Sequence, residues 1–145
     1  MIGLVGMFIG MFVISFFVMP FVMIDSPADW RPALNQAYGA LFMSAAMVLL
    51  MRPRGVVGLA AVGLMAVAAA GVRWQIGVGD REYLHDMLPH HSMAVLTSRA
   101  ALMKTQSPEV YQLASGILKT QEEEIAAMKG MLARGSGLLS QELRP

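Results

Sequence analysis

The distribution of apolar and polar positions divides the chain into two halves of different character. Three long apolar runs fill the first half, at residues 2–24, 34–51 and 55–76. The first run contains no charged residue and has about the 20 residues that a helix needs to span a bilayer. We therefore expect residues 1–76 to form a region of three transmembrane helices, with Pro20 kinking the end of the first.

The N-terminal run is expected to be a retained membrane anchor. A cleavable signal peptide begins with basic residues and has a shorter apolar core that ends in small residues, and this run has neither feature. Arg52-Pro53-Arg54 forms the turn between the second and third runs, and the positive-inside rule places such a turn in the cytoplasm. We expect an integral protein of a bacterial-type inner or plasma membrane, with a cytoplasmic N-terminus and extracytoplasmic residues 77–145.

The second half alternates apolar and polar positions with the period of amphipathic helices. The pattern predicts a helix from Asp80, as its N-cap, to about Lys104. Ser107-Pro108-Glu109 is a typical helix start, and a second helix is expected to run to about Arg134. Residues 77–134 should then form an extracytoplasmic helical hairpin rich in His and Met. Gly135-Ser136-Gly137 is expected to end the second helix and to leave residues 135–145 as a flexible tail.

Composition excludes several kinds of function. Only 14% of the 145 residues are charged, against about 25% in an ordinary soluble domain. The polar half carries as many acidic as basic side chains, so it offers no basic patch and nucleic acid is excluded as a partner. The chain has no cysteine but 14 methionines. A disulfide or thiolate site is therefore impossible, and a soft-metal site has to use Met, His and carboxylate groups.

The histidines cluster in the first amphipathic helix. His85, His90 and His91 are the three histidines of the chain, and Met87 and Met93 flank the adjacent pair. Imidazole is the commonest metal ligand among side chains, and thioether sulfur favours soft ions such as Cu(I). Neighbouring helical residues point about 100° apart, so one ion is not expected to bind both adjacent rings. We expect one ring to ligate and the other to hydrogen-bond a carboxylate or support the first.

The second amphipathic helix also has polar groups where apolar ones are expected. Gln121 and Glu124 lie at core positions of a stripe made of Val110, Leu113, Ala114, Ile117, Leu118, Ile125, Met128 and Leu132. A carboxylate on a core face is costly unless it is paired or bound to a metal. The polar cluster therefore indicates either a metal site or a set of polar contacts that fixes the packing of the two helices.

These residues carry a family resemblance over about residues 80–132. Met87-Leu88-Pro89-His90-His91, followed by Ala94 and then by Gln121, Glu124, Ile125 and Met128, resembles the family known as domain of unknown function 305. Its members are ferritin-like, and some are exported copper- or silver-binding proteins. By position, the resemblance implies the metal ligands Met87, His90, His91, Glu124 and Met128, with Met93, Gln121 and Tyr83 as supporting or additional residues. The chain departs from the family at Gly130-Met131, where an aromatic residue is usual.

A ferritin-like metal site needs four helices, and one chain supplies only two outside the membrane. We therefore expect an all-α protein whose hairpin completes a four-helix bundle in a homodimer or higher oligomer. The expected function is the binding or delivery of Cu(I), or of Ag(I) or another transition metal, without catalysis.

Two alternatives remain open. The first is an accessory subunit of a larger membrane complex, in which the His/Glu cluster only fixes packing. The second is a di-metal oxidase assembled across a dimer, and it ranks last because only Glu124 is well placed among the acids of each chain. The Glu82-x-x-His85 spacing matches a di-metal signature, but it lies on nearly the opposite face from His90 and His91, and we interpret it as a chance match.

Overall fold

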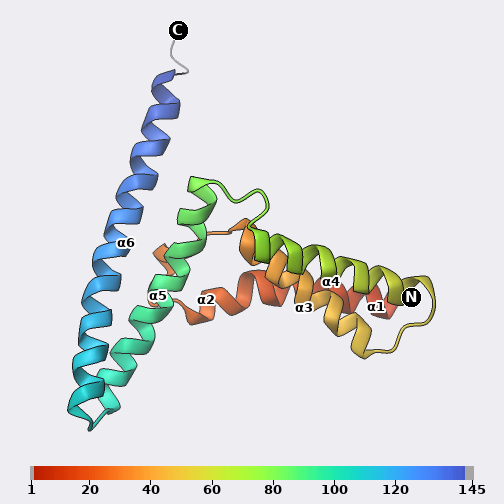
Figure 1. Ribbon diagram of the computed structural model, residues 1–145, viewed down its shortest axis with the longest axis horizontal. Coiled ribbons are helices and arrows are strands. Elements are labelled where there is room, and N and C mark those ends of the chain that lie inside the picture. Colours follow the sequence, from red (N-terminus) through yellow and green to blue (C-terminus); the bar gives the residue numbers. More distant parts are fainter. Residues whose placement is uncertain (1, 143–145) are drawn as a thin grey trace. The chain divides into compact units, whose positions relative to one another are not determined.

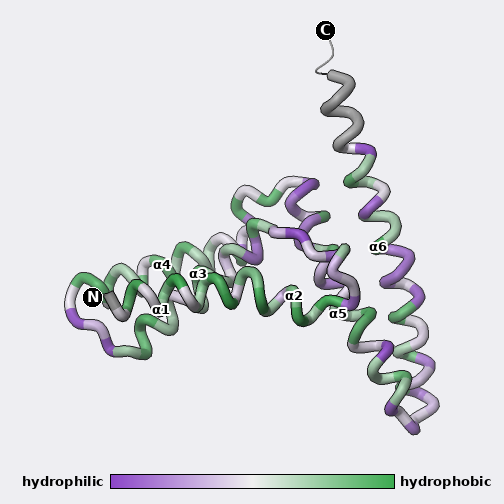
Figure 2. Tube along the Cα trace, turned by 180° about the vertical axis from the view of Figure 1, so that it is seen from behind, coloured by the Kyte–Doolittle hydropathy of each residue, from purple (hydrophilic) through white to green (hydrophobic). Residues whose placement is uncertain are grey.

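The structure of the chain is a computed structural model that describes residues 2–142, and the elements it describes are all helical. The chain divides into two compact units. We call the first the apolar unit; it comprises the residues up to Val22 together with Pro32–Asp86. The second, which we call the hairpin unit, comprises Met23–Arg31 together with the residues from Met87 onward. Figure 2 shows that apolar residues dominate the first unit, whereas polar residues recur along the second. The predicted all-α class is confirmed.

The first apolar run forms α1 (Ile2–Val13), a π-helical turn (Ile14–Val18) and α2 (Met19–Met23). In the wide turn, the backbone N–H of Met19 donates to the carbonyl of Ile14. Pro20 explains this geometry, because it has no N–H and its ring clashes with the carbonyl four residues earlier, at Phe16. The distortion expected at Pro20 therefore takes the form of a π-helical turn immediately before it.

The central helix of the apolar unit is α3 (Leu34–Leu50), which packs against both α1 and α4 (Val56–Trp74). Figure 1 shows these three helices running side by side. The buried positions of α3 and α4 are mostly small: Ala40, Ser44, Ala45, Val48, Ala61, Ala68 and Gly71. Small residues allow helix backbones to approach closely, which is how helices pack in a bilayer.

Gly71 illustrates how tight this packing is. A Cβ atom at this position would lie 2.7 Å from Cδ1 of the Tyr38 ring on α3. The Tyr38 hydroxyl donates a hydrogen bond to the carbonyl of Ile76 at 2.9 Å. The ring is therefore fixed at its polar end and leaves room only for glycine on α4.

Two helical segments are long and apolar enough to cross a membrane, Gly3–Met23 and Val56–Trp74. Three such helices were expected, but α3 has only 17 residues, against 21 and 19 in these two segments. Signal sequences and the core helices of soluble proteins can also satisfy length and composition. A core helix would be mostly covered, whereas the two segments have 0% and 17% of their apolar windows buried. Many of their large apolar side chains are instead exposed.

The polar half forms α5 (Asp80–Lys104) and α6 (Pro108–Glu142), with the Thr105–Ser107 turn between them. The N-cap predicted at Ser107 is confirmed, because its hydroxyl accepts a hydrogen bond from the N–H of Val110 at 3.4 Å. Asp80 is the first helical residue and not the N-cap, since the carbonyl of Gly79 accepts the first bond, from Tyr83 N–H.

The predicted end of the second amphipathic helix near Arg134 is wrong. In the structure α6 continues through Gly135-Ser136-Gly137 to Glu142, and residues 143–145 lie outside the described part. Glycine inside a helix costs only about 1 kcal/mol relative to alanine, so two glycines do not suffice to end a helix that neighbouring residues favour. Residues 135–142 are therefore part of α6.

Candidate metal site on the helical hairpin

The helical hairpin brings one of the two adjacent histidines to Glu124. Nδ1 of His91, on α5, lies 3.0 Å from Oε2 of Glu124, on α6. Nδ1 is buried and does not have hydrogen-bond geometry toward the carboxylate, so the contact is a close approach of the two groups and not a hydrogen bond. Gln121 Nε2 donates to the same Oε2 at 3.3 Å. His91 is thus the histidine that lies beside Glu124, whereas the expected hydrogen bond between the ring and the carboxylate is not formed.

His90 and His91 have different surroundings, as their positions on a helix require. The side chain of His91 is 21% exposed and that of Glu124 is 49% exposed, while His90 is an exposed residue. Adjacent helical side chains diverge by about 100°, so the two rings face different directions along α5. The two histidines therefore have different surroundings, and separate roles for them stay a prediction.

The remaining predicted residues are distributed unevenly. Met128 is buried on α6, whereas Met87 and Met93 are half-buried on α5. Tyr83 is exposed and belongs to the apolar unit, outside the hairpin unit that holds the other predicted residues. Within the described residues, no three His, Asp or Glu side chains form a group that could hold a metal ion. A metal site on this hairpin therefore needs further donors, and methionine sulfur is the donor that the hairpin offers.

Glu82 has a structural role in capping α3, and this role explains the position of its carboxylate without a bound metal. Its Oε2 accepts a hydrogen bond of 3.1 Å from the backbone N–H of Leu34, the first residue of α3. The N-cap residue of α3, Ala33, makes no side-chain cap of its own, so Glu82 caps this helix from α5. One turn later, Asp86 accepts a 3.0 Å hydrogen bond from Asn35 Nδ2. These contacts fit the interpretation of the Glu82-x-x-His85 spacing as a chance match.

A second polar cluster, which sequence reasoning missed, ties the loop 23–31 to the hairpin. The fully buried hydroxyl of Ser92, on α5, accepts from the backbone N–H of Asp25 at 3.0 Å and donates to Asp29 Oδ2 at 2.8 Å. Asp29 is only 4% exposed, and its Oδ1 forms an ion pair with Lys129 of α6. A buried carboxylate requires such partners.

Arg99 links the same loop to both helices. Its Nη1 lies 2.6 Å from Asp25 Oδ2, and its Nη2 lies 2.6 Å from Glu122 Oε1. The hydrogen bond to Glu122 and the charge of Asp25 raise the pKa of Arg99 above its ordinary value. The sequence contained one signal for this cluster. Asp25 and Asp29 are the only acidic residues among the first 72, and both lie in the short loop between two apolar runs.

Comparison with known proteins finds a match to one family model and no matching solved structure. Residues 77–142 match the family model described as "Domain of unknown function (DUF305)". The chain is also 31% identical over 116 residues to "Uncharacterized protein L153" of Acanthamoeba polyphaga mimivirus, covering 74% of this chain and 76% of the relative. Because residues from 77 onward make up less than half of the chain, the similarity to this relative extends into the apolar unit. No solved structure matches significantly. The chain belongs to the DUF305 family.

Proposed function

We propose that the chain is a membrane-anchored protein that binds or delivers a soft metal ion, Cu(I) or Ag(I), at the extracytoplasmic face of the membrane. The observation that carries this proposal is the contact of His91 with Glu124, 3.0 Å apart, in a hairpin that also buries Met128 and presents His90. Imidazole and thioether together form a donor set that suits Cu(I). The cargo ion is a substrate of this site and not a resident cofactor.

Glu124 has a definite chemical role in this proposal. We propose that Nδ1–H of His91 donates to this neighbouring carboxylate when metal is bound, which would leave Nε2 as the atom that binds metal. Glu124 then orients the ring, and Gln121 fixes Glu124 through its 3.3 Å hydrogen bond. The ligands proposed for one ion are His91 and the sulfur atoms of Met87 and Met128, of which Met128 is already buried on α6, while the exposed His90 has a separate, supporting role.

Two ion pairs within the hairpin unit support a topology in which the chain crosses the membrane three times. Asp25 and Asp29, in the loop after the first apolar segment, form ion pairs with Arg99 and Lys129 of the hairpin that follows the third. Residues that form ion pairs lie on the same side of a membrane, so the chain between them crosses an even number of times. If α4 crosses, α3 crosses as well. Its 17 residues extend about 25 Å, near the lower limit for a transmembrane helix.

An exposed apolar stripe supports the proposal of a homodimer. On α6, Ala114 and Met128 of the expected core stripe are buried, whereas Val110, Leu113 and Ile117 remain exposed. Exposed apolar patches of this kind mark interaction surfaces. A second copy that covers the stripe would complete a four-helix bundle and bring a second set of His, Glu and Met residues to the site.

The test is a competitive Cu(I) titration of the full chain purified in mild detergent. We expect saturable binding that is lost in the double variant H90A/H91A and retained in H85A, which removes a histidine of the same helix outside the hairpin unit. Affinity is expected to fall as the pH is lowered from about 7.5 to 5, because protons compete with the metal for imidazole. Equal binding by the wild type and H90A/H91A would contradict the proposal, as would an affinity that does not change with pH.

One observation favours the alternative of an accessory subunit. Glu124 contacts both His91 and Gln121, and such a cluster fixes the packing of two helices without binding anything. This function predicts co-purification with a fixed membrane partner and no stoichiometric metal. The titration above separates the two functions.

A further inference from the structure

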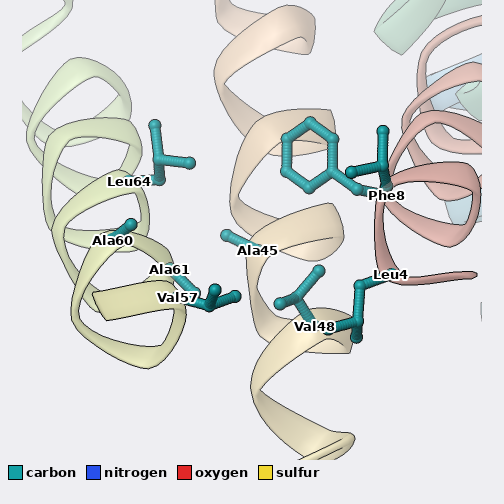
Figure 3. Close-up of a pocket in the computed structure, with 9 residues that line it drawn as sticks. Leu4, Phe8, Ala45, Val48, Val57, Ala60, Ala61 and Leu64 are labelled. Carbon is teal, nitrogen blue, oxygen red and sulfur yellow. The ribbon is translucent and has the colours of Figure 1, made fainter. Parts of the chain in front are cut away.

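The apolar unit contains an open cavity of about 220 Å³ between α1, α3 and α4. Figure 3 shows its lining side chains, which come from all three helices and are without exception apolar. A concave apolar surface of this kind favours contact with apolar groups over contact with water. The cavity is not sealed, because Val5, Val57 and Leu64 on its wall are exposed. An apolar chain can therefore enter it from the side.

The residues on its wall place the cavity next to a pair of positive charges. Val48 lies four residues before Arg52, and Val57 lies three residues after Arg54. Both arginines are exposed in the turn between α3 and α4. The same turn leads into the N-terminus of α4 at Val56, where unpaired backbone N–H groups favour negative charge. One end of the cavity is thus electropositive, while its interior is wholly apolar.

We propose that the cavity and the Arg52–Arg54 turn together bind one anionic glycerophospholipid, with an acyl chain in the cavity and the phosphate at the arginines. This inference rests on the membrane placement proposed above. Charge complementarity selects the anionic headgroup, and the apolar lining selects the chain. The site lies outside the helical hairpin and does not depend on metal binding.

The experiment is native mass spectrometry of the full chain released from nanodiscs that contain equal amounts of phosphatidylglycerol and phosphatidylcholine with matched acyl chains. We expect the retained lipid to be enriched in phosphatidylglycerol. The variant R52Q/R54Q should lower this preference by about fivefold for each arginine, which is the effect of one basic residue at an anionic surface. The control R81Q/K104Q removes the same charge from exposed positions that do not line the cavity and should retain the preference.

The acyl-chain part of the site has its own test. Ala60 lines the cavity and Ala66 does not, although both are exposed on α4. The variant A60L should reduce the retention of both lipids several-fold, whereas A66L should leave it unchanged. An unchanged lipid preference in R52Q/R54Q, or unchanged retention in A60L, would overturn the proposal.

Flotation of vesicles that carry the same chain separates this inference from the membrane placement. A chain that fails to float with the vesicles contradicts both proposals. A chain that floats but shows no lipid preference contradicts only the lipid site.

Discussion

Arg99 Nη1 lies 2.6 Å from Asp25 Oδ2, and this pair joins residues that are 74 positions apart. Asp25 follows the first apolar segment directly, whereas Arg99 lies beyond the third. The pair is part of a polar cluster in which Ser92, Asp29 and Lys129 hold the same loop. The hairpin unit is therefore a helical hairpin together with the short loop 23–31.

The Arg99–Asp25 ion pair predicts on which side of the membrane three positions of the chain lie. The chain has no cysteine, so single-cysteine variants A28C, Q106C and M51C report only on the introduced thiol. All three positions are exposed. On intact spheroplasts, a membrane-impermeant maleimide should label A28C in the loop and Q106C in the hairpin turn, but not M51C. A permeant maleimide should label all three and serves as the control. Labelling of A28C and Q106C from opposite sides would contradict the three-crossing topology.

Ser92 is expected to matter more for stability than a second buried serine on the same helix. The variant S92A removes the donor to Asp29 and the acceptor for the N–H of Asp25, which leaves polar groups of the loop without this partner. Such a loss costs about 1–3 kcal/mol of unfolding free energy. The control is S98A, since Ser98 is also buried but has no hydrogen bond to the loop within the described residues. Denaturant unfolding in detergent measures the unfolding free energy of both variants. An equal loss in S92A and S98A would contradict the role given to the Ser92 hydrogen bonds.

Gly71 should tolerate no side chain, whereas Gly63 on the same helix should. The variant G71A places a Cβ atom 2.7 Å from the Tyr38 ring, while a Cβ atom at Gly63 meets nothing within 4 Å. Overpacking of this kind costs about 1–3 kcal/mol. We expect a lower midpoint of thermal unfolding for G71A and an unchanged or raised midpoint for G63A. If both variants unfold like the wild type, α3 and α4 do not pack as described.

The exposed stripe on α6 predicts an oligomer that a single charge disrupts. The variant L113E places a carboxylate in the middle of the Val110–Leu113–Ile117 stripe and should convert a dimer into a monomer. The control Q112E adds the same charge at the neighbouring exposed position and should remain dimeric. Light scattering coupled to size exclusion, with the detergent contribution subtracted, measures the mass. A monomeric wild type would contradict the proposed four-helix assembly.

Local patterns in the sequence predicted the helices well wherever helix propensity and capping residues determine where a helix begins or ends. The hydrophobic period, the Ser107-Pro108-Glu109 signal and the Arg52-Pro53-Arg54 turn placed most of the helix ends correctly. The end of α6 was predicted wrongly because glycine is only a weak helix terminator within a favourable segment. Helix ends without a specific cap cannot be derived from composition alone.

The candidate site was predicted only in part, because contacts between residues far apart in the chain are hard to recognise in a single sequence. The pairing of a histidine with Glu124 followed from two polar positions on two apolar faces. The role of Asp29 did not follow, because its partners Ser92 and Lys129 lie 63 and 100 positions away and resemble ordinary helix residues. Glu82 was recognised as part of a motif, but its bond to Leu34 depends on how α5 meets α3.

The most direct test of the central claim is X-ray absorption spectroscopy at the copper edge of the Cu(I)-loaded full chain. Because the chain has no cysteine, any sulfur bound to copper has to come from methionine. The account predicts a mixed nitrogen and sulfur shell, which loses sulfur in M87L/M128L and nitrogen in H90A/H91A and is unchanged in H85A. A chain that retains no copper, or a shell that is the same in all of these variants, would contradict a soft-metal site on the hairpin.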